Sequence, residues 1–142
     1  MTVTSHTAGT AVDGATKRTL ANKVGIAISV LIGAFLAFDA VGKFMLPEAV
    51  ADGTAALGFP VHLALVMGIV LAVCVVVYAV PRTAVLGALG LTAYLGGAVT
   101  ANMRIEAPLL THTLFAVFFG VLMWVGLVLR RPELLKVAGL TR

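Results

Sequence analysis

The chain has 142 residues, of which 61% are hydrophobic and 11% are charged, and its formal net charge is +4. Soluble domains carry about 25% charged residues, so this composition excludes an ordinary water-soluble domain and indicates one membrane domain. The charged residues gather at the chain ends and in short connections. The positive charge therefore indicates lysine and arginine flanking a membrane, and not a nucleic-acid partner.

The first predicted element is a long apolar helix that follows a polar segment. Residues 1–22 are polar, and we expect them to form a disordered cytoplasmic tail, because a signal peptide has a shorter apolar region and a cleavage site. The helix is predicted from about Val24 to Leu46 and ends at Pro47. Asp39 and Lys43 lie four positions apart and can pair on one side of it. Small residues recur at every fourth position on another side and favour close helix packing: Gly25, Ser29, Gly33 and Ala37.

Two further apolar helices follow a loop that contains Glu48 and Asp52. One is predicted from about Val61 to Val80 and the next from Thr83 to Ala101. The latter would be about 28 Å long, close to the ~30 Å hydrocarbon thickness of a bilayer. Small residues spaced by fours predict that it contacts another helix, with Gly97 at the contact: Ala93, Gly97 and Ala101.

The last apolar run predicts a fourth helix from about Leu109 to Leu129. Together the four runs predict an all-α fold, a four-helix transmembrane bundle with up-down-up-down order. This domain would cover residues 23–131. Residues 132–142 would form a basic cytoplasmic tail.

The distribution of lysine and arginine predicts the orientation in the membrane. With the N-terminus inside, eight of these residues lie on the inner side and two on the outer side. Because connections rich in lysine and arginine stay in the cytoplasm, we expect a multi-pass protein with both termini there. The inner group is Lys17, Arg18, Lys23, Arg82, Arg130, Arg131, Lys136 and Arg142, and the outer group is Lys43 and Arg104.

This topology brings the chain's unusual polar residues to one level near the outer face. A carboxylate deep in a membrane helix costs ~2.5–3.5 kcal/mol, so Asp39 should be paired or face a cavity. One interpretation is a structural ion pair with Lys43 or Arg104. The other is an outward-facing polar pocket that binds a ligand or a proton. The residues predicted to line this pocket are Asp39, Lys43, Asn102, Arg104, Glu106 and His112.

Three stretches carry a family resemblance: FDAVGKFMLP (Phe38–Pro47), PRTAVLGALGLTAYLGGAVTANMR (Pro81–Arg104) and LVLRRPELL (Leu127–Leu135). In order and spacing they resemble the DoxX-like family of small four-helix membrane proteins, over roughly residues 24–138. The resemblance implies a bacterial cytoplasmic-membrane protein. The family is named after a small subunit associated with a terminal quinol oxidase, and some relatives are linked to membrane redox complexes and to sulfur or thiol stress. The family often has a histidine where this chain has Asn102, which puts a metal ligand or titratable role there in doubt.

The resemblance and the absence of catalytic motifs favour a non-catalytic accessory subunit of a respiratory or other membrane redox complex. Its partners would be the lipid bilayer and subunits of that complex, with a quinone as the cofactor to consider; a homo-oligomer is compatible with this interpretation. No catalytic or metal-binding residues are predicted. The alternative is a small proton-coupled transporter, but Asp39 lies nearer one membrane face than the mid-membrane acid of such proteins. The single Cys74 argues against a thiol-oxidising enzyme, which needs cysteine pairs.

Overall fold

The computed structural model describes residues 6–108 and 113–139, with side chains from Thr19 onward. This part of the chain is helical and contains no strand, so the all-α prediction is confirmed. The helices are α1 (His6–Met45), α2 (Glu48–Ala56), α3 (Leu63–Ala79), α4 (Ala84–Arg104), α5 (Leu114–Arg130) and α6 (Glu133–Val137).

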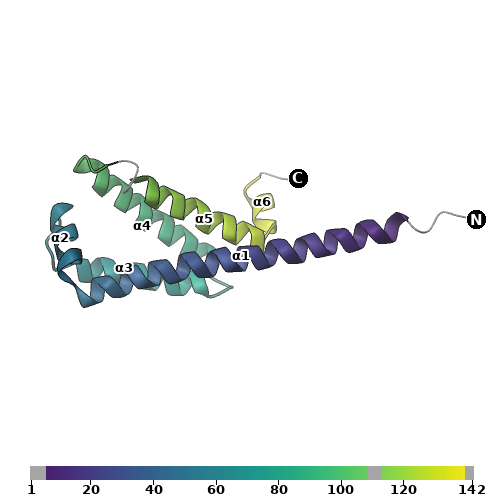
Figure 1. Ribbon diagram of the computed structural model, residues 1–142, viewed down its shortest axis with the longest axis horizontal. Coiled ribbons are helices and arrows are strands. Elements are labelled where there is room, and N and C mark those ends of the chain that lie inside the picture. The colour runs from purple at the N-terminus through teal and green to yellow at the C-terminus, as the bar shows by residue number, and fades with distance from the viewer. Residues whose placement is uncertain (1–5, 109–112, 140–142) are drawn as a thin grey trace, which may run out of the picture.

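The four long helices pack into a bundle (Figure 1). Helix α1 packs against α3 and α5, and α4 packs against the same two helices, so α1 and α4 face each other across the bundle. The short helix α2 and the connection from α4 to α5 lie at one end, which we call the α2 end. The turn from α3 to α4 and the short helix α6 lie at the other, which we call the α6 end.

Helix α1 begins much earlier than the sequence pattern predicted. It runs from His6, within the segment 1–22 for which a disordered tail was expected. No proline precedes Pro47, and the segment is rich in alanine, so nothing in the covalent chain breaks the helix between its first turn and Met45. Figure 1 shows this helix extending well beyond the bundle at the α6 end.

The segment predicted as a loop after Pro47 forms helix α2. Pro47 has an extended backbone (φ −62°, ψ 157°) and stands at the N-cap, where its fixed φ and missing N–H do no harm. Glu48 lies in the first turn, where a negative charge is favoured by the helix dipole. The remaining helices differ from prediction at their ends: α4 continues to Arg104, and α6 occupies part of the predicted basic tail.

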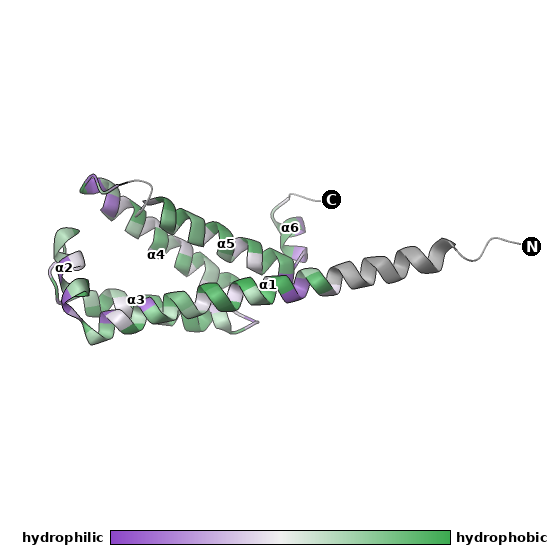
Figure 2. Ribbon diagram, in the orientation of Figure 1, coloured by the Kyte–Doolittle hydropathy of each residue, from purple (hydrophilic) through white to green (hydrophobic). Residues whose placement is uncertain are grey.

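The outer surface of the bundle is apolar. Figure 2 shows hydrophobic colour along the four long helices and hydrophilic colour concentrated near the two ends. Large side chains such as Phe38 and Leu31 are 77% and 69% exposed. In the described residues, Thr19–Met45 and α4 are long and apolar enough to cross a membrane, and α3 and α5 are shorter apolar helices. Such a surface suits lipid better than water.

The bundle core joins three helices through one tyrosine. The Tyr78 hydroxyl on α3 lies 3.1 Å from Ser29 Oγ on α1 and 3.3 Å from the Met123 carbonyl oxygen on α5. Large side chains that are completely buried fill the space around it: Leu71, Leu91, Met123 and Leu127. The buried phenol therefore has polar partners, which it needs in a medium without water.

Two glycine contacts set how closely the helices approach. A Cβ at Gly25 of α1 would lie 2.8 Å from the carbonyl oxygen of Gly126 on α5. A Cβ at Gly87 of α4 would lie 2.2 Å from the backbone nitrogen of Tyr78 on α3. At these crossings a side chain would push the helices apart, as expected for small residues between membrane helices.

The ridge predicted on α4 does not serve this purpose. A Cβ at Gly97 would meet nothing within 4 Å, and Ala93 and Gly97 are both exposed. The prediction that Gly97 lies at a contact between helices of this chain is therefore wrong. The small residues of α4 that do pack, Gly87 and Gly90, lie about two to three turns earlier in the helix, nearer the α6 end.

Candidate functional site

An ion pair lies on the inner side of α1, toward the α2 end. Lys43 Nζ lies 2.6 Å from Asp39 Oδ2, which confirms the predicted pairing of these two residues. Leu36 and Ala40, which neighbour Asp39 on the helix surface, are almost completely buried. The side of α1 that faces the bundle thus carries the charged pair next to its buried residues, and both charged side chains are partly buried.

Helix α3 makes room for the lysine. A Cβ at Gly68 would lie 2.9 Å from Lys43 Cβ and 3.4 Å from the carbonyl oxygen of Ala40. The missing side chain at Gly68 lets the aliphatic stem of Lys43 lie against α3 while its ammonium group reaches back to Asp39. Gly68 gives no signal in the sequence, since one glycine in an apolar run is common in membrane helices.

Tyr94 of α4 faces the ion pair from across the bundle. It packs against the hydrophobic core and lies within electrostatic range of the Asp39 carboxylate. Cys74 lies on α3 against α4, with its Sγ 2.9 Å from where a Cβ of Gly90 would stand. Tyr94 was missed in the sequence analysis, although it is the one titratable side chain in the middle of the predicted third helix.

An aromatic cluster lies one helical turn from Asp39. The ring of Phe35 on α1 lies 5.7 Å from that of Phe115 and 4.6 Å from that of Phe119, both on α5. The two α5 rings are 4.4 Å apart. Because Phe35 and Asp39 are four residues apart, they lie on the same side of α1. Along α1, the ion pair therefore has an aromatic cluster as its neighbour on the side away from the α2 end.

The other predicted pocket residues lie nearer the α2 end. Asn102 is half-buried, and its Nδ2 donates to the Ala98 carbonyl oxygen at 2.8 Å, so the amide folds back onto α4. Arg104 approaches Gly58, whose φ of +78° and missing side chain admit the guanidinium. Glu106 is exposed after α4. His112 lies outside the described residues.

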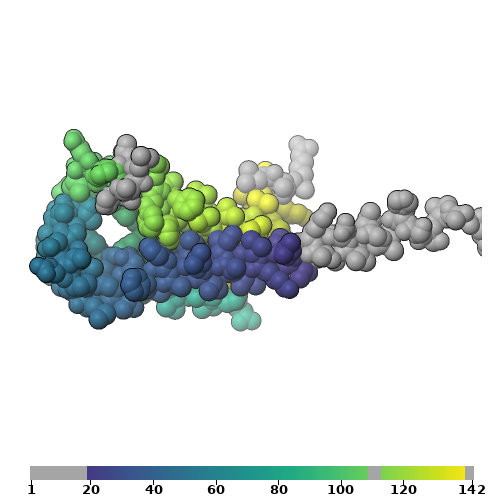
Figure 3. Space-filling view, viewed as in Figure 1, coloured from purple at the N-terminus to yellow at the C-terminus, as the bar shows by residue number. Residues whose placement is uncertain are grey.

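The described structure thus joins Asp39 to Lys43 and places Arg104 against the α2–α3 connection. Thr113, the N-cap residue of α5, is 7% exposed, and its Oγ1 has no hydrogen-bond partner in the structure described. Figure 3 shows an opening at the α2 end, between α2 and the start of α5. A buried hydroxyl without a partner leaves hydrogen-bonding capacity unused.

The side chains at this site are suited to binding a ligand. Lys43 and Tyr94 supply hydrogen-bond donors, Asp39 supplies an acceptor, and the phenylalanine cluster supplies a flat apolar surface. Within residues 6–108 and 113–139, no group of three or more His, Cys, Asp or Glu side chains is placed to hold a metal ion. We call the set of Asp39, Lys43 and Tyr94 the polar site.

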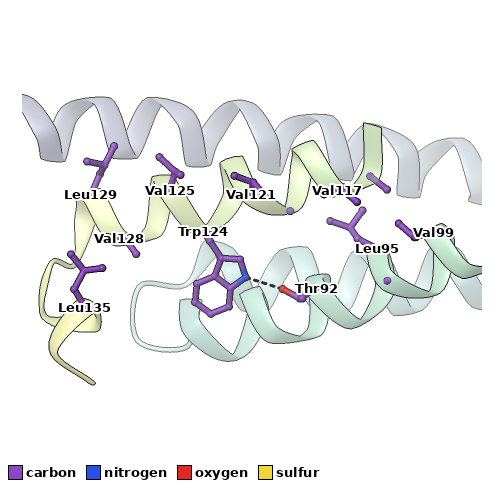
Figure 4. Close-up of a pocket in the computed structure, with 13 residues that line it drawn as sticks. Thr92, Leu95, Val99, Val117, Val121, Trp124, Val125, Val128, Leu129 and Leu135 are labelled. Carbon is purple, nitrogen blue, oxygen red and sulfur yellow. Dashed lines mark hydrogen bonds between the residues drawn. The ribbon is translucent and has the colours of Figure 1, made fainter. Parts of the chain in front are cut away.

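A separate groove runs along α4 and α5 and ends at Leu135 of α6 (Figure 4). It has a volume of about 640 Å³, and its lining is almost entirely apolar. Trp124 on α5 spans the groove, and its Nε1 donates to Thr92 Oγ1 on α4 at 2.9 Å. None of the residues of the polar site lines it.

Comparison with known proteins gives one match. The model of the family described as DoxX-like matches residues 27–126, which include the ion pair, Tyr94 and Trp124. No curated protein and no solved structure matches the chain.

Proposed function

The chain belongs to the DoxX-like family, and from this we propose that it is a non-catalytic accessory subunit of a membrane redox complex that binds a quinone at the polar site. The family assignment and the apolar helices establish its membrane character. The redox partner, the quinone and the placement in the membrane are the proposal.

In this proposal α1, α3, α4 and α5 cross the bacterial cytoplasmic membrane and both termini lie in the cytoplasm. The charge distribution supports this placement, because basic residues are more numerous at the α6 end than at the α2 end. Among the described side chains, Lys43 and Arg104 lie toward the α2 end. Those at the α6 end are Lys23, Arg82, Arg130, Arg131 and Lys136.

The observation that carries the ligand proposal is the Asp39–Lys43 ion pair within an otherwise apolar bundle. Charged side chains in a membrane helix cost ~2.5–3.5 kcal/mol each on insertion scales, and an apolar pair of similar size would avoid that cost. Residues kept in spite of such a cost are candidates for a function.

A quinone head group suits the donors and surfaces present. Its carbonyl oxygens accept hydrogen bonds, which Lys43 and Tyr94 can donate. Its flat ring suits the aromatic surface of Phe35 and Phe119. Its isoprenoid tail is as apolar as the exposed outer face of the bundle. No observation favours the transporter alternative, since Asp39 is engaged by a lysine one turn away.

The test is the quinone content of purified protein. The full chain is extracted in mild detergent, and bound quinone per protein is measured by chromatography before and after adding ubiquinone or menaquinone. We expect bound quinone in the wild type and its loss in Lys43→Met and Tyr94→Phe. The control is Tyr78→Phe, which removes another tyrosine hydroxyl of the bundle, one whose partners are Ser29 and Met123.

Equal quinone content in all four proteins, or none in the wild type after addition, would contradict the proposal. Proteins that co-purify with the wild type test the second half of the proposal. We expect subunits of a quinone-linked membrane enzyme among them, and their absence would contradict the accessory role while leaving the quinone measurement to stand alone.

A further inference from the structure

The groove between α4 and α5 has no role in the proposed quinone site. Its shape and lining indicate what kind of molecule it could bind. It opens sideways, since the α5 valines along it, Val117, Val121 and Val125, are each about half exposed. The indole N–H of Trp124 is already bonded to Thr92, so the ring presents only an apolar surface (Figure 4). The occupant is therefore an apolar group that enters from the side.

The groove runs along most of α5. Its α5 lining extends from Ala116 to Leu129, or about 20 Å at ~1.5 Å per residue, in a helix of 17 residues. One leaflet contributes half of the ~30 Å hydrocarbon core, or about 15 Å. The groove is therefore long enough to hold a single acyl chain over the hydrocarbon depth of one leaflet.

The α6 end of the groove is basic. Leu135 of α6 lines that end, and its neighbour Lys136 is exposed. The Arg131 guanidinium donates to the carbonyl oxygen of Pro81 and so ties the end of α5 to the turn before α4. Exposed Arg82 follows Pro81 in that turn. Among the described residues at this end, Glu133 is the acidic side chain, so basic side chains outnumber acidic ones there.

We propose that this groove binds one acyl chain of an anionic phospholipid, whose phosphate lies at Arg82 and Lys136. The groove supplies apolar length for the chain, and the basic residues at its end supply the charge that distinguishes an anionic head group from a zwitterionic one. The site requires only that the bundle lies in a membrane, and it does not depend on the quinone proposal.

Trp124 provides a direct test, because it is the only tryptophan of the chain and it lines the groove. The full-length protein is reconstituted in phosphatidylcholine vesicles that contain phosphatidylglycerol as a minor component. Bromine, which quenches tryptophan fluorescence on contact, is placed on the acyl chains of the phosphatidylglycerol or on an equal fraction of the phosphatidylcholine. We expect stronger quenching from the brominated phosphatidylglycerol, with about fivefold local enrichment for each basic contact.

Two glycines of α4 provide a matched pair of variants. Both Gly96 and Gly97 have open space where a Cβ would stand, but only Gly96 lines the groove. Gly96→Leu should fill the groove and abolish the preference for phosphatidylglycerol, whereas Gly97→Leu should keep it. In the double variant Arg82→Gln with Lys136→Gln, Trp124 should still be quenched, but brominated phosphatidylglycerol and brominated phosphatidylcholine should quench it equally.

Equal quenching by the two lipids in the wild type would overturn the proposal, as would a preference that survives in Gly96→Leu. Absence of quenching by either lipid would also overturn it, because the groove would then be covered by protein, such as a second copy of the chain.

Discussion

The side chains of α1 show how a charged pair is accommodated among apolar residues. Asp39 and Lys43 are four residues apart, which is the spacing that brings side chains together on one face of a helix. The Lys43 side chain is 16% exposed and the Asp39 side chain is 42% exposed, so neither lies fully inside the bundle, and each supplies the counter-charge of the other. The packing of Lys43 on Gly68 then fixes the lysine stem, and the ion pair becomes part of the contact between α1 and α3.

Removing one partner of this pair should destabilise the protein. In Asp39→Asn the Lys43 ammonium loses its counter-charge, and we expect the free energy of unfolding to fall by about 1–3 kcal/mol. The double variant Asp39→Asn with Lys43→Met should recover most of the loss, since no charge is then left unpaired. Thermal unfolding in detergent measures both. A double variant less stable than the single one would show that the pair is not the relevant interaction.

The Tyr78 hydroxyl allows a second measurement at this scale. Tyr78→Phe keeps the ring but removes the contacts with Ser29 Oγ and the Met123 carbonyl oxygen, so we expect a loss of about 1–2 kcal/mol. Ser29→Ala, which removes one of the two partners, should cost less. If Tyr78→Phe unfolds at the wild-type temperature, the hydroxyl does not link the three helices.

At the scale of the helices, glycines differ in what surrounds them rather than in their spacing. Gly87→Leu should disrupt the bundle, because even its Cβ would overlap the backbone of Tyr78; overpacking costs of 1–3 kcal/mol are typical, and here about 3 kcal/mol or more is expected. Gly97→Leu on the same helix should leave stability within about 0.5 kcal/mol, since that side chain meets open space. Denaturation of both variants in parallel compares their free energies of unfolding. A larger loss of stability for Gly97→Leu than for Gly87→Leu would show that Gly97, and not Gly87, lies at the helix contact.

The contrast between these glycines shows what sequence pattern predicts and what it leaves undetermined. Apolar runs of sufficient length indicated the helices, since lipid requires backbone groups to be bonded within a segment. The side of each helix that packs was harder to predict, because α4 carries small residues on more than one side. In membrane helices the lipid-facing side is as apolar as the core, so hydrophobicity does not distinguish them.

Helix ends were also predicted incompletely. The polar composition before Val24 gives no hydrophobic signal for the start of α1 at His6, although alanine and the absence of proline allow the helix to continue. Helix α2 was missed because its glycine and alanine residues give no amphipathic pattern. These elements depend on local backbone preferences, which are weak signals beside hydrophobicity.

The polar site was predicted in part. The Asp39–Lys43 pair followed from helix geometry, because both residues lie on one element. Tyr94 and the phenylalanine cluster depend on how α4 and α5 are rotated relative to α1, which periodicity alone does not fix when every side of a helix is apolar. Arg104 reaches Gly58 because a glycine with positive φ lies opposite it, and that contact joins two segments far apart in sequence.

At the scale of the whole molecule, the excess of basic residues at the α6 end predicts its orientation. In a chain whose native Cys74 is replaced by serine, a cysteine placed at Asp52 or Glu106 should react with an impermeant thiol reagent added outside the cell. A cysteine placed at Arg82 or Glu133 should react only after the membrane is permeabilised. Labelling of the latter two in intact cells would reverse the orientation.

The contact between the first and the last long helix has a consequence for biosynthesis. Helix α1 packs most extensively against α5, and the two backbones approach each other closely at Gly25 and Gly126. A ribosome makes α5 after α1, α3 and α4, so the partner surface of α1 and the Met123 carbonyl that accepts from the Tyr78 hydroxyl do not exist until α5 has been made. Until that moment the nascent helices can pair only in sequence order, with the buried side of α1 open to lipid or to an insertion factor. Closure of the bundle is thus a late step, and a chain that stops before α5 lacks the contact that completes it.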